Sequence, residues 1–172
     1  MNADDLRKIQ SPLKEQYRSD PESASITLQA EGQIGENISC SVKTGHALIE
    51  AGLHPATGGT GMQACSGDLL LQALVACAGV TLSAVATAIG IDIIAGAIKA
   101  EGDLDFRGTL GVSKEVPVGF TGIRLYFTIT SSATDEQLAS LIRLTERYCV
   151  VYQTISKGVP LMILYNTKSA SP

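Results

Sequence analysis

A long uncharged run in the middle of the chain is the strongest pattern of apolar positions. It extends from Leu69 to Ile91, over 23 residues, with an aspartate on either side. Ser66 is a suitable N-cap for a helix that starts here, and Asp68 then lies in the first turn, where unpaired amides favour a carboxylate. Gly90 is suited to end the helix. The pattern therefore predicts one long helix over residues 66–89.

This run is long enough to cross the hydrocarbon core of a membrane as a helix. Its second half consists mainly of Ala, Gly, Ser and Thr rather than Leu and Phe, and neither end carries an adjacent Lys or Arg. Small side chains instead allow other backbones to approach closely. We therefore expect the helix at the centre of a folded body or of a dimer, and not in a membrane.

Period-two alternation predicts a β-hairpin before the helix and three strands after it. In the hairpin, Ile26, Leu28 and Ala30 alternate with polar residues, and Gly35-Glu36-Asn37 offers a turn before a second alternating stretch. The segment from Thr44 to Gly67 is rich in glycine and is expected to be a loop. The later strands are expected within residues 91–106, 119–132 and 159–167.

A second helix is indicated after Thr134. Asp135 and Glu136 occupy its expected first turn. Apolar residues then recur at helical spacing, at Leu138, Leu141 and Ile142. Residues 1–23 form a polar arm, in which a short surface helix is expected between Pro12 and Pro21.

The order of these elements is hairpin, loop, helix, strands, helix and strand, which predicts an α+β fold with a mostly antiparallel sheet in a single domain over residues 24–172. The first helix is too apolar to have one face in water. A single sheet covers only one side of it, so we infer that a second subunit covers the other side.

Composition narrows the range of partners. The chain has 172 residues, of which 45% are apolar, and 13 Lys and Arg face 17 Asp and Glu, for a formal charge of -4. This balance offers no basic surface for nucleic acid or for an anionic membrane. The N-terminal sequence lacks the pattern of a secretory signal, so a cytoplasmic location is expected.

The cysteines are the most reactive side chains that the sequence offers, and they are Cys40, Cys65, Cys77 and Cys149. None forms a Cys-x-x-Cys pair, and the chain has only two histidines, His46 and His54, so suitably spaced zinc ligands are too few. In a reducing cytoplasm the thiols should be free at rest. We therefore expect no metal and no bound cofactor.

Cys77 lies about ten residues inside the predicted long helix, and its helical neighbours include Thr81. A free cysteine in such a place often packs as a small hydrophobic residue. The dipole of its own helix acts only at the end turns, so a lowered pKa would need a cation from elsewhere. From the local sequence alone, an inert role is favoured.

Two other cysteines offer alternatives. Cys65 lies where the loop meets the long helix, a position that stabilises a thiolate, and His54 is a candidate base eleven residues before it. Cys149 ends the second helix, with Arg147 two residues before it. Cys65 is therefore a rival reactive thiol, whereas Cys149 also fits an ordinary core position.

Taken together, SGDLLLQALVACAGVTL and RYCVVYQTISKGVPL resemble the two cysteine segments of the OsmC/Ohr family, the osmotically inducible and organic hydroperoxide resistance proteins. The resemblance extends over roughly residues 24–166. It implies an intertwined homodimer in which sheets wrap around two long central helices. It also implies a peroxidase in which Cys77 attacks an organic hydroperoxide, Cys149 resolves the sulfenic acid, and a dithiol or lipoyl-type reductant reopens the disulfide.

The chain differs from the family pattern at two positions. Members carry an Arg in a Gly-Arg-Asp-Gly turn after the first strand, whereas Gln33 stands at that slot here. They also carry a Glu ten residues before the first cysteine, where this chain has Gly67 followed by Asp68, the candidate substitute. A cation from another direction would have to come from Arg18, Arg107, Arg124, Arg143 or Arg147.

Two other functions compete with the peroxidase. The first is a non-catalytic redox sensor, or a binder of small apolar ligands, on the same fold, because a fold does not fix a function. The second is a different thiol chemistry at Cys65, with His54 as its base.

Overall fold

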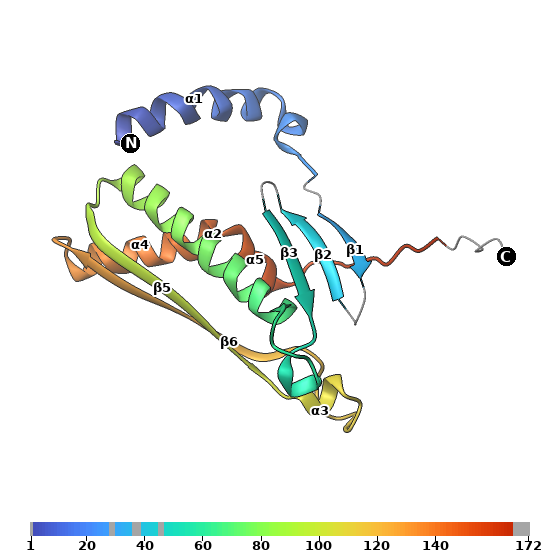
Figure 1. The fold of residues 1–172 in the computed structure, drawn as a ribbon. Coiled ribbons are helices and arrows are strands. Elements are labelled where there is room, and N and C mark those ends of the chain that lie inside the picture. The colour runs from blue at the N-terminus through green and yellow to red at the C-terminus, as the bar shows by residue number, and fades with distance from the viewer. Residues whose placement is uncertain (1, 28–29, 36–38, 45–46, 167–172) are drawn as a thin grey trace.

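The computed structural model describes residues 2–27, 30–35, 39–44 and 47–166. They form an α+β structure that begins with a helical arm (Figure 1). The helical elements are α1 (Ala3–Ser19), η1 (Pro21–Ala24), η2 (Pro55–Thr57), α2 (Ser66–Ile89), α3 (Phe106–Thr109), α4 (Asp135–Tyr148) and α5 (Val150–Lys157). The strands are β1 (Glu31–Gly35), β2 (Ser39–Thr44), β3 (Ala47–Gly52), β4 (Ala64–Cys65), β5 (Ile93–Leu104) and β6 (Phe120–Ser131).

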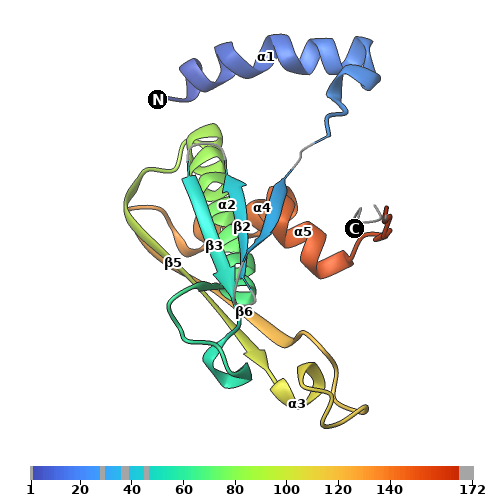
Figure 2. The ribbon, with the colours of Figure 1, turned by 45° about the vertical axis from the view of Figure 1, so that its right-hand side comes forward.

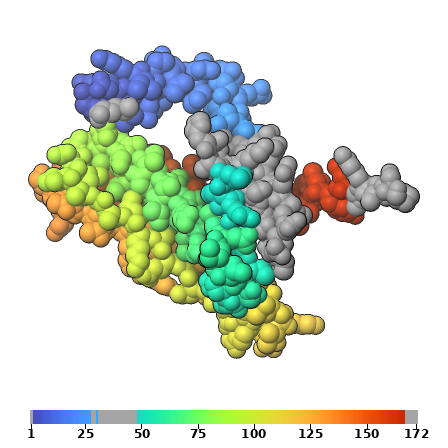
Figure 3. Space-filling model, viewed as in Figure 1, coloured from blue at the N-terminus to red at the C-terminus, as the bar shows by residue number. Residues whose placement is uncertain are grey.

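The arm is mainly one helix, α1, which lies beside α2 (Figure 3). The helix starts earlier than predicted because Asn2 and Asp5 form a capping box, in which the Asp5 amide donates to Asn2 Oδ1 at 2.9 Å. Pro12, which was expected to precede the helix, lies inside it. The prediction of a surface helix in the arm is confirmed, but its predicted start is wrong.

The first sheet has the strand order β1-β2-β3-β4. β1 and β2 pair antiparallel, with Ile34 opposite Cys40, which confirms the predicted hairpin. Its first strand begins at Glu31 rather than at Ile26. The predicted turn at residues 35–37 lies largely outside the described residues.

β3 corrects the prediction that residues 44–67 form a loop. It pairs antiparallel with β2 along its whole length, and its last two residues pair in parallel with β4. The strand is stabilised by hydrogen bonds to the neighbouring strands β2 and β4, which are distant contacts that the glycine-rich local sequence does not predict.

α2 spans the predicted residues and ends at Gly90, whose φ of 75° lies in the left-handed region. The N-cap is Cys65 rather than Ser66, and its side chain makes no capping hydrogen bond. The buried residues of α2 recur every fourth position and form one narrow stripe, at Leu74, Ala78, Leu82 and Ala86.

The length and apolar composition of α2 would suffice for a membrane span. Core helices of soluble proteins pass the same test, so this property is weak evidence for a membrane. In this fold α2 packs against β5, α4 and α5. These contacts bury one stripe of the helix and leave much of its remaining surface exposed.

The second sheet is the antiparallel pair β5 and β6, which confirms two predicted strands. The pair forms a long ribbon, with α2 lying along it (Figure 1, Figure 2). The core lies between α2, α4 and this ribbon, where Leu82, Ala86, Ile91 and Leu141 are buried. Partly buried apolar residues surround them, among them Ile98, Phe127 and Leu138.

α4 confirms the predicted second helix, with a capping box between Thr134 and Gln137. It ends at Tyr148, and a further helix, α5, starts at Val150 after the single residue Cys149. The sequence interpretation did not include α5 as a separate helix.

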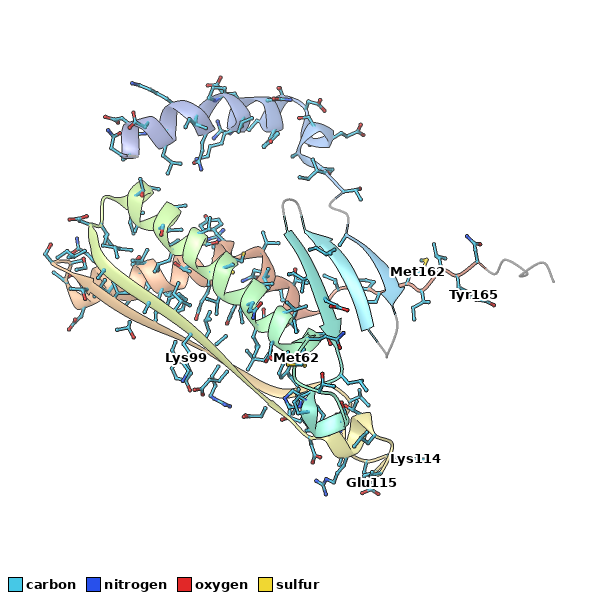
Figure 4. All side chains as sticks on the ribbon, viewed as in Figure 1. Met62, Lys99, Lys114, Glu115, Met162 and Tyr165 are labelled. Carbon is cyan, nitrogen blue, oxygen red and sulfur yellow. The ribbon has the colours of Figure 1, made fainter. Side chains whose placement is uncertain are left out.

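The predicted last strand is wrong. Residues 159–166 are exposed and form no strand, and Met162 and Tyr165 lie on a segment that extends away from the body of the molecule (Figure 4). A strand needs the edge of a neighbouring strand for its hydrogen bonds. Within the described residues, no strand of the same chain pairs with this segment.

Candidate active site

α2 packs against α4 and α5, and Cys77 and Cys149 lie close enough for each side chain to shift the pKa of the other. Cys77 is half-buried on α2, next to Ala78 of the buried stripe. Cys149 is only 1% exposed and is both the C-cap of α4 and the N-cap of α5. Its φ of -72° and ψ of 107° interrupt the helical path. Both cysteines are free thiols.

The first turn of α5 supplies amide donors to this pair. The Gln153 amide is the first to bond within the helix, to the Cys149 carbonyl at 2.9 Å, so the three amides before it need other acceptors. The amides of Val150 and Val151 act to lower the pKa of Cys77. The amides of Tyr152 and Val151 act in the same direction on the pKa of Cys149.

These contacts lower the pKa of Cys77. Partial burial acts in the opposite direction and favours the neutral thiol. The hydrogen bonds from the Val151 amide, the Cys149 thiol, the Thr81 hydroxyl and the Val150 amide outweigh it, because they stabilise the thiolate. The pKa of Cys77 therefore lies below that of an ordinary cysteine.

The pKa of Cys149 is raised instead. Burial is the main cause, and the hydrogen bond to Cys77 together with the charge of that sulfur adds to it. The amides of Tyr152 and Val151 offset only part of this effect. Of the two thiols, Cys77 is therefore the one that ionises first, and Cys149 remains its hydrogen-bond donor.

The activating cation expected from the sequence is not among the groups that act on Cys77 in the described part of the chain. Arg147 is exposed and lies over the ring of Tyr148, with 5.5 Å between its guanidinium carbon and the ring centroid. Arg107 pairs with Asp105, and Arg124 pairs with Asp103. The side chain of Gln33 lies outside the described structure.

Sequence reasoning missed α5 as a separate helix, whose first amides act to lower the pKa of Cys77. Gly158 after Lys157, at the end of α5, was the available signal of a further helix. Thr81 was recognised as a helical neighbour of Cys77, without a role.

An apolar cavity of about 510 Å³ lies between α2, β6 and α5, and neither Cys77 nor Cys149 is among its lining residues. It is lined by residues of α2, β6 and α5, which include Leu74, Phe120, Ile123, Tyr152 and Ile155. Leu74 precedes Cys77 by one helical turn, and the Tyr152 amide binds the Cys149 sulfur. Two of its lining residues are thus close in sequence to the two cysteines.

The other candidate residues lie near the N-terminal end of α2. His54, Cys65 and Asp68 line a separate cavity of about 370 Å³. The His54 ring stacks on Phe106 with centroids 4.9 Å apart, and its Nδ1 accepts a hydrogen bond from the Ala56 amide at 3.0 Å.

The two thiol positions on α2 are too far apart to form a disulfide. Cys65 precedes Cys77 by twelve residues, which corresponds to about 18 Å along a helix. A disulfide requires Cα atoms within about 7 Å. Asp68, at the same end of the helix as Cys65, is not among the groups that act on Cys77 in the described structure.

Comparison with known proteins adds a family to this geometry. The OsmC-like protein family matches residues 59–163 of the chain, a range that contains Cys65, Cys77 and Cys149. No curated protein matches the chain.

Several solved structures share the fold. An OsmC-like protein from Mycoplasma pneumoniae is 20% identical, with a TM-score of 0.65 over 78% of this chain and 90% of that one. An organic hydroperoxide resistance protein from Elizabethkingia anophelis is 19% identical, with a TM-score of 0.62 over 78% and 90% of the two chains. Another, OsmC from Legionella pneumophila, is 20% identical, with a TM-score of 0.60 over 76% and 89%. At these identities the likeness establishes the fold.

The lowered pKa of Cys77 makes its reactivity testable. In the folded protein, the rate of Cys77 alkylation is expected to reach half its maximum at a lower pH than in the urea-unfolded chain, because the thiolate is the reactive form. Quantitative mass spectrometry of the Cys77 peptide would measure this midpoint. A midpoint equal to or above that of the unfolded chain would contradict the described hydrogen bonds.

Proposed function

The chain belongs to the OsmC-like protein family, and we propose that it is a thiol-dependent peroxidase that reduces organic hydroperoxides in the cytoplasm. The observation that supports this function most is the contact between Cys77 and Cys149, with the pKa of the first lowered and that of the second raised. This is the asymmetry needed by a nucleophile and its resolving partner.

The first step uses Cys77 as the nucleophile. Its thiolate attacks one oxygen of the hydroperoxide, so that an S–O bond forms and the O–O bond breaks. The departing alkoxide takes a proton and leaves as an alcohol. Sulfur is oxidised to a sulfenic acid, and the peroxide is reduced.

The second step uses Cys149. Its sulfur attacks the sulfur of the Cys77 sulfenic acid, the S–S bond forms, and the S–O bond breaks. Hydroxide combines with the proton given up by Cys149 and leaves as water. A dithiol or lipoyl-type reductant then reopens the disulfide by exchange, and is itself oxidised.

The apolar cavity between α2, β6 and α5 supports an apolar substrate. It measures about 510 Å³, and most of its lining side chains are aliphatic or aromatic. Such a site gains free energy by burying an alkyl or aryl group, which hydrogen peroxide lacks. The substrate class that fits best is therefore an alkyl or aryl hydroperoxide.

The same cavity supports the second candidate function, a redox sensor or a binder of small apolar ligands. A sensor would be oxidised once per peroxide molecule and would not be reduced rapidly by a dithiol. A binder would be stabilised by an apolar molecule that carries no peroxide group. Turnover separates these functions from the peroxidase.

The assembly in this proposal is an intertwined homodimer in which the sheets wrap around the α2 helices of both copies. α2 buries only one stripe, and Val80 on this helix is 73% exposed. The segment after α5 is also exposed, with Leu161 at 92% and Ile163 at 90%. Apolar surface of this extent is typical of a protein interface.

The roles of the two cysteines predict different failures. Cys77→Ser should reduce the turnover of cumene hydroperoxide with a dithiol reductant by about a thousandfold or more, because the thiol that remains, Cys149, is buried and has a raised pKa. Cys149→Ser should still react once and should then accumulate a sulfenic acid that dimedone labels. Stopped-flow kinetics and mass spectrometry measure the two outcomes.

Cys65→Ser is the matched control, because it removes a cysteine of α2's N-terminus that lies far from the pair. It should keep the wild-type rate. Full turnover in Cys77→Ser would refute the assignment, and loss of activity in Cys65→Ser would favour the rival thiol.

The homodimer is tested by sedimentation velocity over a wide concentration range. The wild type should sediment as a dimer, and the double variant Leu161→Asp, Ile163→Asp should shift toward a monomer, because buried carboxylates would be left without partners. Leu110→Asp changes an exposed loop residue and is the control. A wild-type monomer at every concentration would refute the dimer.

A further inference from the structure

We propose that Phe120 is a specificity-determining residue, whose ring closes the apolar cavity at the end away from the cysteines and limits the length of the alkyl chain that the cavity accepts. This inference rests on the proposed peroxidase function, because it sets a limit on the substrate of that site. Three features of the structure support it: a β-bulge, two glycines, and the place of the ring between two cavities.

The β-bulge turns the Phe120 side chain toward the inner face of the β5–β6 ribbon. From Ile123 to Thr130, the odd-numbered residues of β6 are partly buried and the even-numbered ones are exposed. The pairing of β5 with β6 shifts by one residue at Thr121, which reverses this order, so that Phe120 is partly buried and Thr121 is exposed. The Thr121 hydroxyl donates to the Asp103 carbonyl at 3.2 Å across the bulge.

Two glycines leave the space that the ring occupies. A Cβ at Gly102 of β5 would lie 2.5 Å from Cδ1 of Phe120 and 3.2 Å from its Cζ, closer than packed carbon atoms approach. A Cβ at Gly67, in the first turn of α2, would lie 3.4 Å from the same Cζ. The ring therefore extends from the ribbon to the start of α2, and its position depends on the lack of a side chain at residue 102.

The ring lies between two cavities. Among the lining residues that the structure describes, Phe120 alone belongs both to the apolar cavity of about 510 Å³ and to the cavity of about 370 Å³ that includes His54. Along α2, Leu70 and Leu74 line the apolar cavity, and most of the α2 residues that line the other cavity lie nearer the start of the helix. Removal of the ring would therefore join the two cavities.

The apolar cavity lies in the interval between this ring and the reactive thiol. Gly67, which faces the ring, precedes Cys77 by ten residues, or about 15 Å along the helix. Leu70 and Leu74 line the cavity within this interval. A linear hydroperoxide with its O–O bond at Cys77 would extend its alkyl chain past Leu74 toward Phe120.

This placement predicts how affinity depends on chain length. Each methylene that enters the cavity should strengthen binding about fourfold, the gain expected when one CH₂ group leaves water. The gain should stop at the chain length that reaches the Phe120 ring, since further methylenes remain in water. We call this length the limiting chain length.

The first test uses the primary alcohols from butanol to dodecanol, which carry the alkyl chain without a peroxide group. Isothermal titration calorimetry of the wild type should show an affinity that rises about fourfold per methylene and then becomes constant. In Phe120→Ala the rise should continue beyond the wild-type limiting chain length, because the second cavity is open to the chain. Phe120→Leu should extend the limit by less.

Gly102→Ala tests the position of the ring by an independent change. Its methyl group would displace the ring, so the limiting chain length should differ from that of the wild type. Gly96→Ala is the matched control on the same strand, because its Cβ would lie 3.6 Å from Ile93 Cγ2, an ordinary contact. Phe106→Leu changes an aromatic residue that lines only the second cavity, and it should also keep the wild-type limit.

Two results would overturn the proposal. One is the same limiting chain length in the wild type, Phe120→Leu and Gly102→Ala, variants that keep the proposal testable even where Phe120→Ala does not fold. The other is a wild-type protein that binds none of the alcohols.

Turnover of primary alkyl hydroperoxides is scored separately. A limiting chain length that moves with Phe120, in a protein that turns over no hydroperoxide, would uphold the role of this residue and refute the peroxidase. Turnover with one limiting chain length in every variant would uphold the peroxidase and refute the role of Phe120.

Discussion

The packing of α2 against α4 and α5 holds the thiols of Cys77 and Cys149 close enough to shift each other's pKa. This contact creates an asymmetry between two otherwise similar thiols. Burial alone would raise the pKa of both, but only Cys77 has enough donors to reverse the effect, with Thr81 among them.

The fold was predictable where a segment carries its own signals. The uncharged run closed by Gly90 predicted α2, and the Thr134 cap predicted α4, because capping and periodicity are local properties. β3 was missed because its hydrogen bonds come from β2 and β4. Residues 159–166 have the apolar sequence of a strand, yet among the described residues no strand offers them an edge to pair with.

The sequence predicted which two cysteines form the candidate site, but not what lowers the pKa of Cys77. The resemblance to the OsmC/Ohr family selected Cys77 and Cys149, and the structure brings these two together. His54, Cys65 and Asp68, which were grouped with them, lie in another cavity. The source of activation was misjudged, because the search was limited to side-chain cations. The sequence does not show which backbone amides will lie near a given side chain. Their effect on the pKa of Cys77 therefore becomes visible only in the three-dimensional structure.

The central claim is that peroxide oxidation joins two thiols that the fold already holds together. Peptide mapping by mass spectrometry, after addition of one equivalent of cumene hydroperoxide and blocking of the remaining thiols, tests it most directly. The account predicts a disulfide between Cys77 and Cys149 within each chain, in nearly stoichiometric yield. A disulfide that involves Cys65, or a protein whose thiols all remain reduced, would contradict it.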